Sequence, residues 1–130
     1  MKQSILMERY PIFDLELPKG ETTMKSVDDI IAYLHAKIEA HPIAAYIGIF
    51  DHFAHTKALP EGKIAPEIVD AKLIVFCFGT AIPNPHVMAV RPRSIAVADL
   101  GEKFVLSFME PPMPVATTAM EAWVKELKNV

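Results

Sequence analysis

Two nearly uninterrupted apolar runs constrain the fold of this chain more than any other feature of its sequence. The first extends from Ile43 to Phe50 and the second from Leu73 to Phe78, and both contain β-branched or aromatic residues. Short apolar runs of this composition are typical of β-strands. Because neither run alternates with polar residues, we expect both strands to be central in a sheet or covered on both faces.

A segment before the first run carries apolar residues at helical spacing. Ser26 is a favourable N-cap, and Asp28 and Asp29 follow in the first turn, where the helix dipole favours negative charge. Pro42 ends the segment after His41. The apolar face of this predicted helix consists of Val27, Ile30, Ile31, Leu34 and Ile38.

The last part of the chain predicts a hairpin and a closing helix. Residues Ser94 to Ala98 and Lys103 to Phe108 flank a turn that contains Gly101. After a proline cluster, Thr118 and Glu121 have the spacing of a capping box. The apolar face of the closing helix consists of Ala119, Met120, Trp123 and Leu127.

One more strand precedes the first helix, because Phe13, Leu15 and Leu17 alternate with acidic residues. The resulting order, β-α-β-β-β-β-α, predicts an α+β sandwich with a four- to five-stranded mixed or antiparallel sheet and helices packed on one face. A chain of 130 residues fits a single domain, residues 1–130.

The charge pattern bounds the partners of the chain. Charged residues make up 22% of the sequence, the formal net charge is −3, and the lysines and arginines are scattered. Nucleic-acid-binding proteins usually carry a basic stripe, so we expect no nucleic-acid partner. No apolar run approaches the ~20 residues of a membrane span, so we expect no membrane partner and a cytoplasmic location. With Cys77 as the one cysteine, no intramolecular disulfide can form.

The first apolar run leads directly into Asp51 and His52, with His55 shortly after. An imidazole beside a carboxylate is suited to general acid–base catalysis, and two histidines with a carboxylate are suitable metal ligands. On a strand, however, His52 and His55 would point to opposite faces. We therefore predict no metal site and no cofactor. The simpler alternative is a strand end whose polar groups bond to nearby backbone.

A second polar segment follows the second apolar run and contains Gly79, Asn84 and His86. Backbone N–H groups at the start of a short helix here could meet a carboxylate or phosphate, or Asn84 with Pro85 could simply mark the start of that helix. Because both polar segments follow strands that we expect to be central, we predict that they share one pocket. The candidate ligand-binding residues are Asp51, His52, Gly79, Asn84 and His86, and the candidate catalytic residues are Asp51 and His52.

Methionines offer another kind of ligand. Met88, Met109 and Met113 together with His86 would suit copper or haem, because thioethers are soft ligands. Methionines more often fill irregular apolar gaps or line adaptable surfaces.

Several separated motifs occur in the order of a known family. They are Ser26-Val27-Asp28-Asp29, Asp51-His52, Leu59-Pro60, Phe78-Gly79, Asn84-Pro85, Val90 to Pro92, and Met109-Glu110-Pro111. This succession resembles the domain of unknown function 302 family of small bacterial and archaeal α+β proteins, over residues 20–129. The resemblance implies a compact domain that is often dimeric. It implies no activity, because that family has none assigned.

These observations favour a small soluble α+β protein that acts as a homodimeric ligand-binding or interaction module, with itself and a small molecule as partners. We expect binding rather than catalysis. The first alternative is an enzyme acting on a small molecule, in which His52 is a base oriented by Asp51 and assisted by His86 or Asn84. The second is a metal or haem carrier that uses histidines and methionines.

Overall fold

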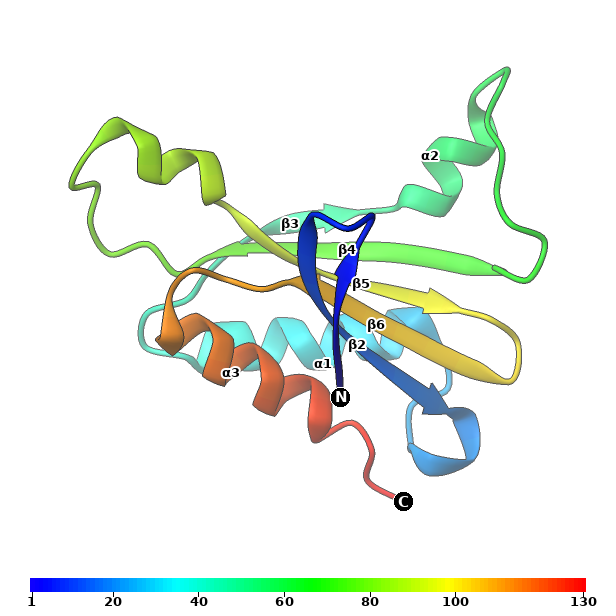
Figure 1. Cartoon of the computed structure of the whole chain (residues 1–130). Coiled ribbons are helices and arrows are strands. Elements are labelled where there is room, and N and C mark those ends of the chain that lie inside the picture. Colours follow the sequence, from blue (N-terminus) through cyan, green and yellow to red (C-terminus); the bar gives the residue numbers. More distant parts are fainter.

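A single antiparallel sheet of six strands, in the order β1-β2-β6-β5-β4-β3, organises the protein (Figure 1). The computed structural model describes residues 1–130. Strands β3 to β6 form a continuous meander, and β2 joins this meander beside β6. The strands are β1 Lys2–Leu6, β2 Tyr10–Pro18, β3 Ala45–Phe50, β4 Asp70–Cys77, β5 Arg93–Asp99 and β6 Lys103–Met109.

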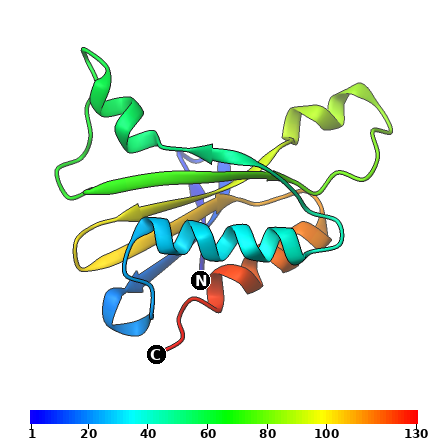
Figure 2. The ribbon, with the colours of Figure 1, turned by 180° about the vertical axis from the view of Figure 1, so that it is seen from behind.

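Helices α1 and α3 lie under one face of the sheet, as the two opposite views in Figures 1 and 2 show. The α-helices are α1 Val27–Ala40, α2 His52–Ala58 and α3 Pro114–Lys125, and the 3₁₀-helices are η1 Lys19–Glu21 and η2 Pro85–Val90. Helix α1 begins where its sequence predicts. The Ser26 hydroxyl group accepts a hydrogen bond from the Asp29 N–H at 3.1 Å.

The hydrophobic core lies between α1, α3 and the sheet face that they cover. Alternate residues of the strands point into it, since side chains alternate between the two faces of a sheet. The strands β2, β4, β5 and β6 and the residue after β4 contribute Phe13, Leu15, Leu17, Ile74, Phe76, Phe78, Ile95, Val97, Phe104, Leu106 and Phe108. All five predicted face residues of α1 are buried, as are Met120, Trp123 and Leu127 of the predicted closing helix. Ala119 is partly buried against the core.

The predicted α+β class and the helices on one face are confirmed, but the sheet has six strands rather than four or five. The strand that the sequence did not predict is β1, which pairs with β2. The turn between them places Met7 and Glu8 at φ values of 54° and 60°. Glycine or asparagine usually marks such a turn, and neither occurs there, so the hairpin had no local signal.

Strand β3 differs from its prediction, because it is an edge strand and not a central one. Ile47 and Ile49 are exposed there. A strand with an uninterrupted apolar sequence is buried on both faces only where other elements cover it, and none covers β3 in this way. The sequence of β3 correctly predicts a strand but gives no information about its neighbours.

Helix α3 begins at Pro114, four residues before the predicted capping box at Thr118. No side chain caps this helix, and proline occupies its first position, where the missing N–H costs no hydrogen bond. Thr118 therefore lies inside the helix, and the capping-box prediction is wrong.

The second face of the sheet, which we call the open face, carries no helix packed flat against it (Figures 1 and 2). Two segments rise beyond this face at opposite ends of β4: the α2 arm, residues 51–69, and the η2 arm, residues 79–92. By register, the side chains of β4, β5 and β6 that point to the open face are Ala71, Leu73, Val75, Cys77, Ser94, Ala96, Ala98, Lys103, Val105, Ser107 and Met109.

Candidate functional site

Asp51 is the N-cap of helix α2, where its Oδ1 atom accepts a hydrogen bond from the Ala54 N–H at 3.0 Å. Because the chain turns into a helix here, His52 and His55 lie three residues apart on α2, and the expectation that they diverge along a strand is wrong. Both imidazole rings lie near the Phe50 ring, with centroid distances of 5.0 and 5.3 Å.

The structure does not join Asp51 and His52 into an acid–base pair. The Asp51 carboxylate contacts the backbone of its own helix and lies 3.8 Å from the Lys72 ammonium group. The His52 Nδ1 atom is instead hydrogen-bonded to the Thr56 hydroxyl group, 2.8 Å away. The Lys72 pKa is raised, chiefly by a hydrogen bond to Asp28 and less by the charge of Asp51. The base of the enzyme hypothesis therefore lacks the carboxylate that would orient it.

Asn84 has a similar capping role at the start of η2. Its Oδ1 atom accepts hydrogen bonds from the backbone N–H groups of His86 and Val87, at 2.9 and 3.3 Å. Pro85 takes the first helical position. These two N–H groups already have a protein acceptor, so the helix-start interpretation of Asn84 and Pro85 is confirmed. The His86 side chain is exposed.

The structure separates the two polar segments that we expected to share a pocket. Phe50 pairs with Leu73 at one end of the β3–β4 ladder, and Ala45 pairs with Cys77 at the other. At ~3.4 Å per residue, Asp51 and Gly79 are therefore on the order of 20 Å apart. Figure 1 shows α2 and η2 at opposite ends of β4. The pockets that His52 and Gly79 line have no residue in common, so the prediction of one shared pocket is wrong.

His52 lines a small pocket on the α2 arm together with Phe53, Thr56 and Ile68. Its volume is about 210 Å³. Lys63 is the cationic residue that lines this pocket. Asp51 is not among its lining residues, because its carboxylate is turned toward the helix backbone.

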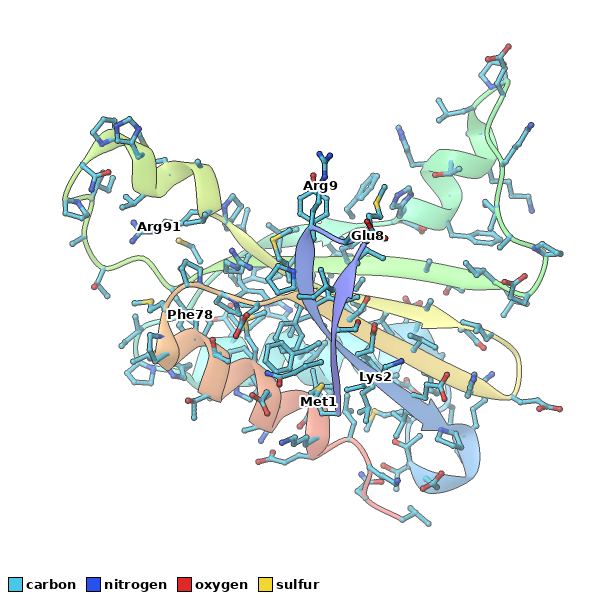
Figure 3. All side chains as sticks on the ribbon, in the orientation of Figure 1. Met1, Lys2, Glu8, Arg9, Phe78 and Arg91 are labelled. Atoms are coloured by element: carbon cyan, nitrogen blue, oxygen red, sulfur yellow. The ribbon has the colours of Figure 1, made fainter.

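Gly79 lines a different cavity, under the η2 arm, which we call the arginine pocket. Its volume is about 230 Å³. The guanidinium-bearing residues Arg91 and Arg93 line it, and much of its remaining surface is apolar. That apolar surface comes from Phe78, Val87, Val90, Pro111, Met113 and Ala116. Figure 3 shows Phe78 and Arg91 at this end of the sheet.

Backbone carbonyl groups hold both arginines. The Arg93 Nη1 and Nη2 atoms donate to the carbonyl oxygens of Val90 and Met109 at 2.9 and 2.8 Å. The buried Nε atom of Arg93 has no hydrogen-bond partner, and burial lowers the pKa of this guanidinium. The Arg91 Nη1 atom donates to the Ala81 carbonyl at 2.6 Å.

Gly79 has a specific role beside Arg91. A Cβ atom on Gly79 would lie 2.7 Å from the Arg91 Nη1 atom and 2.8 Å from its Cζ atom. The guanidinium therefore lies against the Gly79 backbone, and a side chain at position 79 would displace it. Gly79 was a predicted site residue, whereas neither arginine was predicted. The available signal was the segment Arg91-Pro92-Arg93, which contains two cations and no acid.

The residues considered for metal binding do not form a recognisable centre. No group of three or more histidine, cysteine, aspartate or glutamate side chains lies close enough together to hold a metal ion. Met113 lines the arginine pocket, whereas Met88 and Met109 are exposed.

Comparisons with known proteins bear on the family and not on the site. None of the helices combines the length and apolar character that crossing a membrane requires. A search of curated proteins found no match. One family model matches residues 1–129, and its description reads "Family of unknown function (DUF6858)". The match thus supports an uncharacterised family, but not the domain of unknown function 302 that the motifs resemble. The chain belongs to the DUF6858 family.

Proposed function

We propose that the protein is a self-associating interaction module in which the open face of the sheet packs against the open face of a second copy. One observation carries this proposal: the strands β4, β5 and β6 present an apolar face that no element of the chain packs flat against. A six-stranded sheet with helices on one face leaves half of its side chains without a packing layer.

The open face has the composition of an interface, with an apolar centre and a charged margin. At its centre, Leu73, Val75 and Ala96 are only partly buried. At its margin on β2 and β6, the Glu16 carboxylate forms an ion pair with Lys103 at 2.9 Å. When a partner packs on such a surface, water is excluded from its apolar centre.

Large exposed apolar side chains surround the open face. Phe50 at the end of β3 is 40% exposed, and on the η2 arm Ile82 and Met88 are 68% and 52% exposed. At the turn between β1 and β2, Met7 is 74% exposed. Exposed apolar side chains of this size around an uncovered sheet face favour an interaction site here.

The open face alone is smaller than a standard interface. Five strands about 4.8 Å apart and about 20 Å long give a face of roughly 400 Å² in projection, before the relief of the side chains and the two arms is added. A standard interface takes about 800 Å² from each partner. The two arms and the exposed apolar side chains around the open face would therefore have to supply about half of the area that each copy buries.

A second copy fits this surface better than a partner of different chemistry. The centre of the open face carries no charged side chain that would demand an opposite charge on its partner. An apolar patch is complementary to itself, and twofold symmetry brings the same patch of both copies together. Two sheets packed face to face at about 10 Å would form a shared core.

The test measures mass in solution by sedimentation equilibrium, with Val75→Glu as the variant. We expect twice the chain mass of 14.4 kDa for the wild type and the single-chain mass for the variant, because a buried unpaired carboxylate strongly opposes packing. Val115→Glu is the matched control. Val115 is an exposed apolar residue on α3, at the helical side, and its substitution should leave the dimer intact.

A second variant separates face packing from edge pairing. Ile47→Lys places a charge on the free edge of β3, which would prevent strand addition but leave the centre of the open face unchanged. If Ile47→Lys abolishes the dimer and Val75→Glu does not, the copies pair through their edges and the proposal is wrong. A monomeric wild type at high micromolar concentration would also overturn it.

A further inference from the structure

We propose that the arginine pocket binds the carboxylate group of a small organic acid with an aromatic or branched aliphatic body. The pocket lies beneath the η2 arm, beside Phe78 and Arg91 (Figure 3), away from the centre of the open face. The inference therefore does not depend on self-association of the protein.

The first argument is uncompensated charge. Arg91 and Arg93 both line the pocket, and neither forms an ion pair with a carboxylate. Six of the eleven other lysines and arginines lie within ion-pair distance of an acid: Lys19, Lys37, Lys72, Lys103, Lys125 and Lys128. The carbonyl groups that hold the two arginines accept hydrogen bonds but do not neutralise charge. A bound anion would do so.

The second argument is the unused hydrogen-bonding capacity of Arg93. A guanidinium group has five N–H donors, and Arg93 uses two of them on carbonyl oxygens. Its Nε atom is buried without a partner, which is uncommon for a charged group in a folded protein. An unpaired buried donor is costly unless a ligand or water supplies the acceptor. The carbonyl contacts fix the guanidinium before any ligand arrives, so binding would order little.

The third argument is the close contact between Gly79 and Arg91. The Arg91 guanidinium lies within contact distance of the Gly79 backbone and donates to the Ala81 carbonyl. These contacts hold a second positive charge at the pocket wall. Two guanidinium groups held by backbone contacts form a preorganised site for a planar anion.

The lining and size of the pocket define the rest of the ligand. Phe78, Val87 and Met113 present apolar surface opposite the charged wall. An apolar cavity of about 150 Å³ is enough for a benzene ring. The arginine pocket, at about 230 Å³, therefore has room for a ring or a branched chain with a carboxylate attached.

A monocarboxylate suits this lining better than phosphate does. Phosphate carries more charge and must lose more hydration when it enters a pocket with apolar walls. A carboxylate is planar and matches the fork of a guanidinium group through two parallel hydrogen bonds. The apolar body of an organic acid gains from burial against the lining, whereas phosphate has no such body.

The experiment titrates ¹⁵N-labelled full-length protein with sodium benzoate at constant ionic strength and follows amide chemical shifts. We expect saturable shifts that concentrate at the residues of the arginine pocket. Arg91→Gln should raise the dissociation constant for benzoate by about tenfold or more, which is about 1.4 kcal/mol. Arg9→Gln is the matched control, because it removes the same charge from an exposed residue at the turn between β1 and β2, and it should leave the dissociation constant unchanged.

Two further arms keep the proposal falsifiable if Arg91→Gln fails to fold. Gly79→Ala should also weaken benzoate binding, because the new methyl group displaces the Arg91 guanidinium without changing any charge. Benzamide, which has the ring but no charge, should bind more weakly than benzoate. Equal binding of benzoate and benzamide, equal competition by inorganic phosphate, or no saturable shifts at the pocket would each overturn the proposal.

Discussion

Tyr33 on α1 links the two helices of the covered face through its hydroxyl group. The Tyr33 Oη atom donates a hydrogen bond to the Trp123 carbonyl at 2.8 Å and lies 3.4 Å from the Glu126 carboxylate. Burial, followed by the charge of Glu126 and the hydrogen bond to it, raises the pKa of Tyr33 to about 12. The neutral phenol is therefore favoured in the folded protein. The stabilisation that Tyr33 contributes between the two helices thus depends on pH.

Tyr33→Phe tests the link. The variant should lose about 1 kcal/mol of unfolding free energy at pH 7, since it removes one hydrogen bond to a backbone carbonyl. Because the pKa of Tyr33 in the folded protein lies above its ordinary value of 10.0, the contribution of Tyr33 to stability is fully present below pH 10 and declines as the pH rises toward 12. Urea unfolding of both proteins at a series of pH values measures this. A difference in unfolding free energy that stays constant from pH 7 to pH 12 would contradict the assignment.

The polar residues of the candidate site show what single residues reveal before the structure is known. Asp51 and Asn84 were identifiable as unusual polar residues at strand ends, and both prove to be helix caps. Their side-chain oxygens accept hydrogen bonds from the nearby backbone. In the sequence, a capping Asp or Asn cannot be distinguished from one that binds a ligand. Arg91 and Arg93 gave little signal in the sequence, because only the folded structure shows that backbone carbonyl groups hold them and that neither forms an ion pair.

Among the elements, the hairpin of β1 and β2 carries a local conformational cost. Met7 and Glu8 both adopt the left-handed backbone region, which disfavours residues with a side chain. Glu8→Gly should therefore raise the unfolding free energy by about 1 kcal/mol. Chemical denaturation measures the shift in midpoint.

The turn between β5 and β6 offers a control substitution that should change the unfolding free energy in the opposite direction. Gly101 has a φ of 90°, and Gly101→Ala should lower the unfolding free energy by about 1 kcal/mol although nothing crowds the added methyl group. If Glu8→Gly and Gly101→Ala shift the midpoint in the same direction, the backbone argument fails.

The elements also explain why the fold was more predictable than the site. Helix α1 and the hairpin of β5 and β6 were readable because the cap at Ser26 and the turn at Gly101 are local signals. Helix α2 was missed because Asp51 was interpreted as the end of a strand and not as an N-cap. The prediction of one shared pocket was wrong because β3 and β4 pair in antiparallel orientation. Antiparallel neighbours bring the end of β3 beside the start of β4, so the segments that follow the two strands lie at opposite ends.

For the whole molecule, the lone cysteine offers a reporter of association. Cys77 is partly exposed, and by register its side chain points to the open face beside Leu73 and Val75. If two copies share this face, the rate of Cys77 alkylation should fall as protein concentration rises. In the Val75→Glu variant the rate should not depend on concentration.

The melting temperature gives an independent measure of the same equilibrium. Association of folded copies stabilises the folded state by mass action, so the wild type should melt at higher temperature as its concentration increases. The Val115→Glu control should keep this dependence and Val75→Glu should lose it. Concentration-independent melting and alkylation of the wild type would together contradict self-association through the open face.

The strand order also sets a sequence of events during biosynthesis. Strand β2 is made early, yet one of its two neighbours is β6, at residues 103–109. As the ribosome releases the chain from its amino end, the meander of β3 to β6 can assemble from near neighbours. The hairpin of β1 and β2 must wait for that meander, because pairing across such a separation is slow. The residues of β1 and β2, which are made before the meander, are thus among the last to join the sheet.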